Sequence, residues 1–266
     1  MKRWIPFVKT PPLVAVVRLS GIIAAGVRPG ALSDAALADQ LEKAFRRGKP
    51  KAVALVINSP GGSPVQSSLI GARIRNLAEK YEMPVYAFIE DVAASGGYWL
   101  AASADEIWVD ASSIVGSIGV ISASFGFHDL MARQGIERRV HTAGKDKSML
   151  DPFRPERPED VKRLKRLQAQ IHESFIAHVK ERRGDRLADQ DDLFTGEIWV
   201  GAKSVEVGLA DGVGHLGPKM REVFGDDVRF VPYGLKRSLF QRFGARLVSD
   251  ALTQLDENAL WARYGL

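Results

Sequence analysis

The chain has 266 residues, of which 45% are hydrophobic and 26% are charged, and its formal net charge is +5. A chain of this length and composition can bury a full core, which excludes an intrinsically disordered protein. The absence of Cys excludes disulfides, a cysteine nucleophile and thiolate metal sites, and the modest, dispersed positive charge gives no indication of nucleic-acid binding.

Strands and helices are predicted to alternate through the first half of the chain. Short β-branched or aromatic runs bounded by turn residues predict the strands, and apolar side chains at helical spacing predict the helices. Alternation of this kind indicates a largely parallel sheet with helices on its faces. The predicted strands are 13–19, 52–58, 84–90 and 106–110, and the predicted helices are 34–47 and 64–80.

The second half of the chain carries two further amphipathic patterns. Residues 158–183 predict a long packed helix that ends at a glycine after three basic residues. In the tail, residues 235–266, basic side chains lie opposite apolar ones, a pattern that fits a helix packed on a neighbour or one resting on a membrane surface. No signal peptide and no run of 18 apolar residues is readable, so we expect a cytoplasmic protein or one held peripherally at the inner membrane.

Two glycine turns follow strand ends, where open α/β sheets gather their active sites. Ser95 precedes Gly96-Gly97 and a helical segment, so it is either a helix cap or a nucleophile near unpaired backbone N–H groups. The turn at Gly61-Gly62 could bring backbone N–H groups close to a substrate, as an oxyanion hole requires. A phosphate-binding loop would need a lysine after these glycines, and none is present.

A serine nucleophile needs a base. The five histidines, at positions 128, 141, 172, 178 and 215, lie in no recognisable motif. A lysine can serve instead where burial keeps its amine neutral.

Five motifs together resemble the bacterial signal peptide peptidases of the SppA/SohB type, a serine peptidase family that shares the Clp protease and crotonase architecture. They occur in the family's order between residues 58 and 211. The motifs are NSPGGS at 58–63, ASGGYW at 94–99, GSIGV at 116–120, AGKDKS at 143–148, and FTGEIW at 194–199 continuing to GLAD at 208–211.

The resemblance implies a role for each candidate site residue. Ser95 would be the nucleophile and Lys147 the general base. Ser117 would orient the lysine amine, and the N–H groups of Gly62 and Gly96 would form the oxyanion hole. The reaction needs no metal and no cofactor.

Two departures from the family stand out. Asp146 precedes the lysine, where relatives often carry an aromatic or uncharged residue, and we expect its carboxylate to point toward solvent or Lys145, since beside Lys147 it would hold the ammonium form. We also expect the chain to lack the transmembrane anchor that many relatives possess.

The resemblance implies a Clp protease/crotonase-like α/β fold, with a mostly parallel sheet, flanking helices and a helical C-terminal extension. We assign residues 1–225 to the peptidase domain and 226–266 to a C-terminal strand and helical tail. The expected activity is endopeptidase cleavage of apolar peptides, such as signal peptide remnants or membrane-protein fragments, by a homo-oligomer. Peptides or proteins are thus the expected partners, with contact to a membrane surface left open.

Three alternatives remain open at this point. The same architecture hosts acyl-CoA enzymes, in which glycine N–H groups polarise a thioester. Ala93-x-Ser95-x-Gly97 is also an alanine variant of the α/β-hydrolase nucleophile turn, which would need His215 as its base. A scaffold that kept the fold without activity is the third.

Overall fold

The computed structural model describes residues 11–26, 31–144, 147–234, 258 and 260–266. The chain divides into two compact units. We call residues 1–118 and 176–266 the sheet unit and residues 119–175 the inserted unit, and we describe each by itself.

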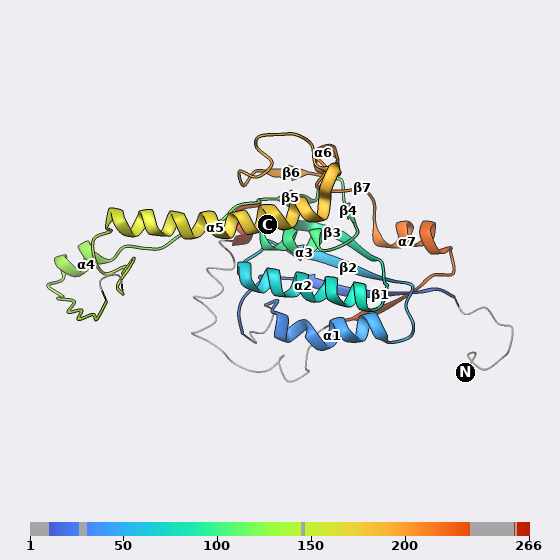
Figure 1. Ribbon diagram of the computed structural model, residues 1–266, viewed down its shortest axis with the longest axis horizontal. Coiled ribbons are helices and arrows are strands. Elements are labelled where there is room, and N and C mark those ends of the chain that lie inside the picture. Colours follow the sequence, from blue (N-terminus) through green and yellow to red (C-terminus); the bar gives the residue numbers. More distant parts are fainter. Residues whose placement is uncertain (1–10, 27–30, 145–146, 235–257, 259) are drawn as a thin grey trace. The chain divides into compact units, whose positions relative to one another are not determined.

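In the described residues the sheet unit contains one sheet of eight strands (Figure 1). Its path is β6-β5-β3-β2-β1-β8, while β4 pairs with both β3 and β7. All pairs are parallel except β5 with β6. The strands are β1 Leu13–Ser20, β2 Ala52–Ser59, β3 Val85–Ala94, β4 Glu106–Val109, β5 Ile114–Gly116, β6 Ile198–Val200, β7 Gly212–Val213 and β8 Arg229–Tyr233.

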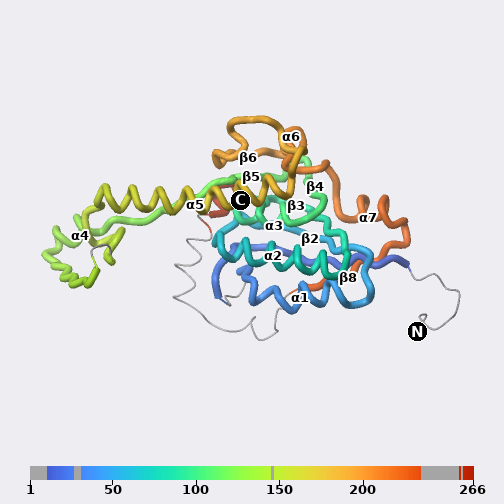
Figure 2. The backbone as a smooth tube through the Cα atoms, in the orientation of Figure 1, coloured from blue at the N-terminus to red at the C-terminus, as the bar shows by residue number. Residues whose placement is uncertain are grey.

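Helices α1, α2 and α3 lie side by side in chain order along the sheet (Figure 2). Serine caps begin the first two, because the Ser33 hydroxyl accepts a hydrogen bond from the N–H of Ala36 and the Ser63 hydroxyl accepts one from Gln66. A short 3-10 turn, Gly184–Arg186, follows α5. The helices are α1 Asp34–Arg46, α2 Pro64–Lys80, α3 Gly96–Ala102, α4 His128–Arg133, α5 Pro158–Arg183, α6 Ala202–Glu206 and α7 Leu216–Phe224.

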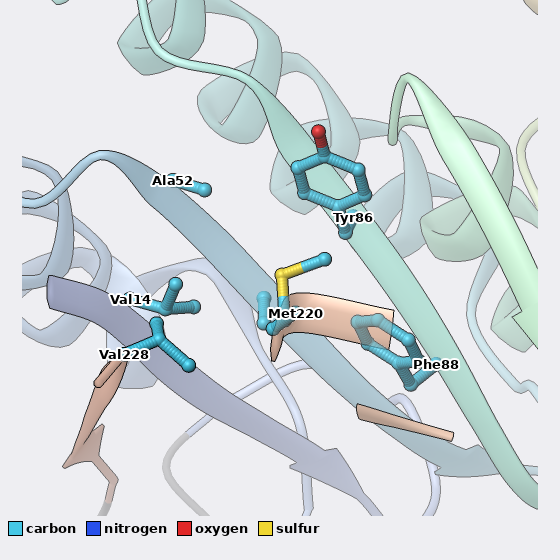
Figure 3. Close-up of a cluster of buried hydrophobic side chains, with 7 residues drawn as sticks. Val14, Ala52, Tyr86, Phe88, Met220 and Val228 are labelled. Carbon is cyan, nitrogen blue, oxygen red and sulfur yellow. The ribbon is translucent and has the colours of Figure 1, made fainter. Parts of the chain in front are cut away.

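Both faces of the central strands are covered. All residues of β2 except one are buried, as expected of a parallel strand with helices on either side. On one face, Met220 of α7 packs against side chains from three strands (Figure 3). These neighbours alternate along their strands, so they share one side of the sheet: Val14, Ala52, Ala54, Tyr86 and Phe88.

The predicted fold class is confirmed: the structure is mixed α/β, with a mostly parallel sheet and flanking helices. Every strand and helix predicted in the first half is present, and α5 has the predicted bounds. Strand β3 continues beyond its predicted end at residue 90 as far as Ala94, which carries the chain directly into Ser95. The predicted tail helix lies mostly outside the described residues, at 235–257 and 259. None of the described helices combines the length and apolar character needed to cross a bilayer.

The inserted unit holds α4 and most of α5 and has almost no core of its own. Among its described residues, only Asp160 and Phe175 are buried. Three phenylalanine rings are grouped at its surface, with Phe127 lying 6.3 Å from Phe125 and 5.7 Å from Phe153 between ring centroids. Phe125 is 79% exposed.

A buried ion pair fixes the end of α5 in the sheet unit. The Arg183 guanidinium donates to both carboxylate oxygens of Asp211, at 2.8 and 3.1 Å, and its side chain is 1% exposed. Burial, the largest influence, raises the pKa of the Asp211 carboxyl. The bonds from Arg183, the N–H of Ile107 and the charge of Arg186 outweigh it, so the pKa lies below its ordinary value.

We predict that Asp211→Asn lowers the free energy of unfolding by about 3–5 kcal/mol at neutral pH, because it leaves a buried guanidinium without its counter-charge. Since the carboxyl pKa is depressed on folding, this stabilisation is complete above the unfolded pKa of about 3.9 and is lost as the pH falls through the folded value. Urea unfolding at pH 7 and at acid pH measures both effects. Glu222→Gln, which removes an exposed pair with Lys219, is the control and should change little. An unchanged Asp211→Asn protein would contradict the role of the pair.

Candidate active site

Ser95 occupies a strained turn between β3 and α3. Its backbone has φ 51° and ψ −122°, a conformation that residues with a side chain rarely adopt and that costs of order 1–3 kcal/mol. The residue stands at the N-cap of α3, yet its side chain makes no capping hydrogen bond. The hydroxyl is therefore not used as a helix cap, and the residue is partly exposed.

The glycine turn after β2 lies directly against this serine. A Cβ on Gly61 would stand 2.7 Å from the backbone nitrogen of Gly96 and 2.9 Å from Cβ of Ser95, so no side chain fits there. A Cβ on Gly62 would stand 2.0 Å from the carbonyl oxygen of Ile23. That carbonyl accepts the N–H of Ser63 at 2.7 Å, which ties the turn to the segment after β1. The two glycine turns thus pack backbone against backbone.

This packing leaves backbone donors beside Ser95. Among the described residues, no acceptor is found for the N–H of Gly62 or of Gly96. Gly62 is exposed, and its nitrogen would lie 3.4 Å from a Cβ built on Gly96, so both groups border the same space. The arrangement can accept a developing oxyanion.

The end of β5 lies next to Ser95 and brings Ser117 to the site. Ala94 pairs with Gly116, and the N–H of Ser95 donates to the Gly116 carbonyl at 2.9 Å. Ser117 therefore follows its strand next to Ser95, also with a positive φ of 51°. Its N–H donates to the Glu197 carbonyl at 2.7 Å, which joins the site to the loop before β6.

Two side-chain contacts, one made by α3 itself and one by α5, hold α3 in place after Ser95. The buried Tyr98 hydroxyl donates to the Leu209 carbonyl at 2.9 Å, and burial raises the pKa of this phenol. The His178 ring stacks on Trp99 with centroids 4.7 Å apart, and its Nε2 lies 3.1 Å from the Trp99 carbonyl oxygen. Burial lowers the pKa of His178, which favours the neutral ring that donates to this carbonyl.

The predicted base lies in the inserted unit. Lys147 is exposed within that unit, in a turn where its N–H donates to the Gly144 carbonyl at 3.2 Å. Its neighbours Lys145 and Asp146 lie outside the described residues. The expected orientation of the Asp146 carboxylate therefore stays a prediction. The structure thus brings together four of the predicted site residues within the sheet unit: Ser95, Gly62, Gly96 and Ser117. Lys147 belongs to the inserted unit, which is described by itself.

His215, the base that an α/β-hydrolase would need, is paired elsewhere. Its Nε2 lies 2.8 Å from a carboxylate oxygen of Asp110, and this hydrogen bond is the largest cause of a lowered pKa for Asp110. Asp110 follows β4, which pairs with the first half of β3, whereas Ser95 follows the second half of β3. His215 is therefore hydrogen-bonded at a different strand end from that of Ser95.

Three residues that border the site were not found from the sequence. The buried Ser59 hydroxyl accepts the N–H of Gly61 at 3.2 Å, and the Ile23 backbone packs against Gly62. Tyr264 donates its hydroxyl to that of Ser117 at 3.4 Å. Ser59 lies within the NSPGGS motif and could have been suspected, but the other two contacts join distant parts of the chain and leave no local pattern.

The model of peptidase family S49 matches residues 78–222, which is more than half of the chain. The chain belongs to peptidase family S49. The matched residues include Ser95, Ser117 and Lys147, and the resemblance seen in the five motifs is confirmed.

Two relatives that are named as proteases support the S49 assignment. The chain is 32% identical to protease 4 of Haemophilus influenzae, over 77% of this chain and 33% of that protein. It is 31% identical to the chloroplastic serine protease SPPA of Arabidopsis thaliana, over 76% of this chain and 31% of that protein. A Brucella abortus protein named Na(+)/H(+) antiporter NhaA is 48% identical over the whole chain, which spans 39% of that protein. The S49 chain thus covers well under two thirds of the length of these relatives.

Proposed function

We propose that this S49 chain is a serine endopeptidase whose nucleophile is Ser95 and whose general base is Lys147. One observation carries the proposal: in a chain of a peptidase family, a serine that caps nothing stands on a strained turn beside two N–H groups for which the described residues offer no acceptor. A turn that merely connected β3 to α3 would have no need of that strain.

In this mechanism Lys147 Nζ takes the proton of Ser95 Oγ as the oxygen attacks a peptide carbonyl. The N–H groups of Gly62 and Gly96 bind the oxyanion, and the protonated lysine gives its proton to the leaving amine. Water, deprotonated by the same lysine, then hydrolyses the acyl-enzyme. Ser117 would accept a hydrogen bond from the amine and hold it in line with Ser95. No step requires a metal or a cofactor.

The proposed substrates are apolar peptides, such as signal peptide remnants or fragments of membrane proteins. The similarity to proteins named as proteases supports peptides as the substrate class. Their apolar character is what the resemblance of the five motifs to signal peptide peptidases implies. The antiporter name of the Brucella protein is not carried over, because the family model that matches this chain is that of a peptidase family. A cytoplasmic or peripheral location stays a prediction.

Cleavage assays with the purified chain test the proposal against its rivals. We expect hydrolysis of apolar peptides that continues in the presence of a chelator, and no turnover of acyl-CoA thioesters. Thioester turnover without peptide cleavage would favour the acyl-CoA enzyme, and loss of activity in His215→Ala would favour the α/β-hydrolase. A chain that hydrolyses nothing and reacts with no serine-directed probe would be a scaffold.

We also propose that the protein is a homo-oligomer assembled through the inserted unit. A unit of this size with almost no buried side chains cannot be stabilised by a core of its own. It instead exposes many large apolar side chains, three of them grouped as phenylalanine rings, and exposed apolar patches mark interaction surfaces. The most exposed are Ile121 at 66%, Phe125 at 79%, Leu130 at 53% and Ile136 at 57%. A second copy of the chain presents the same apolar surface and is the occupant we propose.

Charged substitutions should dissociate this assembly. We expect the wild-type chain to sediment as a multiple of its 29.2 kDa mass, and Ile121→Asp/Phe125→Asp to sediment as a monomer, because a buried unpaired carboxylate is costly. Val213→Asp, at a residue 48% exposed in the sheet unit, is the matched control and should leave the mass unchanged. A wild-type monomer whose inserted unit binds anionic lipid vesicles would contradict the proposal and identify a membrane surface as the partner.

A further inference from the structure

Strand β3 contains an irregularity just before the proposed nucleophile. Ile57 of β2 pairs with Ile89 of β3, but Ser59 pairs with Ala93. Two steps along β2 therefore correspond to four steps along β3, so β3 carries a bulge of two extra residues. Bulges bend a strand and redirect the residues that come after them, and they are common next to active sites.

The bulge lies where β3 changes its neighbour. Before it, Ile89 pairs with Val109 of β4, and after it, Val92 pairs with Ile114 of β5. The pairing with β5 is what allows the N–H of Ser95 to reach the Gly116 carbonyl. The position of Ser95 thus depends on the path that β3 takes through its bulge.

The side chain of Asn58 fills the gap that the bulge opens on the β2 side. Its Oδ1 accepts the N–H of Val92 at 3.3 Å, and its Nδ2 donates to the Asp91 carboxylate. Its backbone carbonyl accepts the N–H of Gly21 at 3.0 Å, which fixes Asn58 to the segment after β1. A side-chain amide therefore replaces the ladder bond that β2 and β3 cannot make here.

A serine supports the bulge from the other side. The Ser113 hydroxyl lies 3.1 Å from the Ile89 carbonyl oxygen and 2.5 Å from that of Glu90, and it accepts the N–H of Asp110 at 2.9 Å. The extra residues of β3 are thus held from both edges by side chains. The Ser113 bonds go to residues 89 and 90, whereas those of Asn58 go to residues 91 and 92, closer to Ser95.

We propose that Asn58 is a positioning residue for Ser95, acting through the bulge in β3. The inference rests on the proposed function, in which the Ser95 oxygen must meet a substrate carbonyl held by Gly62. Three residues separate Asn58's partner Asp91 from Ser95, so a change in the bulge is passed along a short, extended segment. A misplacement of about 1 Å at a reacting atom can lower a rate about 100-fold.

An exchange of the two side chains tests this role. Asn58→Asp sets a carboxylate against Asp91, so the donor is lost and like charges face one another; we expect kcat to fall about 10- to 100-fold with KM little changed. In Asn58→Asp/Asp91→Asn the amide and the carboxylate trade places, and the carboxylate now at position 58 can still accept the N–H of Val92. This double variant should recover to within a few-fold of wild type.

Two single variants serve as controls. In Asp91→Asn the new side-chain carbonyl still accepts from Asn58, so activity should stay close to wild type. Glu90→Gln removes the neighbouring exposed pair with Arg18 and should also have little effect. A kcat for Asn58→Asp equal to that of wild type, or a double variant no better than the single one, would overturn the proposal.

A second readout does not depend on catalysis. Hydrogen exchange of the amides at 92–95 should be faster in Asn58→Asp and return to the wild-type rate in the exchange variant. Unchanged protection in Asn58→Asp would refute the positioning role by itself. If protection changes as expected while the wild-type chain cleaves no peptide, the proposed function fails and the structural role of Asn58 stands.

Discussion

Ser95→Ala is expected to lower peptide cleavage by at least about 10³-fold, because no other group can form the acyl-enzyme. The variant should fold normally. Alanine keeps Cβ, so the strain at φ 51° is unchanged, and the lost hydroxyl makes no capping bond. The free energy of unfolding should therefore stay within about 0.5 kcal/mol of wild type. Initial rates on an apolar fluorogenic peptide, with urea unfolding in parallel, measure both quantities.

Two further variants separate catalysis from folding. Ser95→Gly should be equally inactive but more stable by about 1 kcal/mol, because glycine adopts a positive φ without strain. Ser112→Ala, at an exposed serine after β4, should retain full activity. Peptide cleavage by Ser95→Ala at a wild-type rate would remove the nucleophile from the account.

Lys147→Arg is expected to lower peptide cleavage about as much as Ser95→Ala does. Arginine keeps the positive charge but stays protonated at every accessible pH, so it cannot accept the serine proton. With the general base removed, kcat should fall by about 10³-fold or more while peptide binding is retained. Steady-state kinetics at a fixed pH, with KM measured alongside kcat, separates the loss of catalysis from any loss of peptide binding.

Lys145, two residues before Lys147, provides the control for this substitution. Lys145→Arg makes the same chemical change two residues away and should leave kcat within a few-fold of wild type. Equal losses in both variants would indicate a general need for this segment and not a single base. Full activity in Lys147→Arg would reject the dyad, whatever the outcome for Ser95.

The sheet was largely predictable because its central strands are buried on both faces. Such strands appear as continuous apolar runs, and the runs at 13–19 and 52–58 match β1 and β2 closely. The peripheral strands are too short to leave a pattern: β5 and β6 have three residues each and β7 has two. The extension of β3 was missed because Asp91 interrupts its apolar run at the bulge.

The residues of the candidate site could be predicted from the sequence, whereas the contacts that support them could not. The motifs pointed to Ser95, Gly62 and Ser117, which the fold brings together at strand ends. The contribution of Asn58 could not be inferred, because a bulge is a relation of register between two strands and neither strand shows it alone. The contact of Tyr264 with Ser117 joins residues 147 positions apart, which no local pattern encodes.

The rate of covalent labelling by a fluorophosphonate probe measures whether Lys147 activates Ser95. Intact-mass measurement should show one adduct on the wild-type chain, which peptide mapping places on Ser95. The labelling rate should fall at least about 100-fold in Lys147→Arg, because an unactivated serine hydroxyl is a weak nucleophile. Labelling of another serine, or equal rates for wild type and Lys147→Arg, would contradict the account.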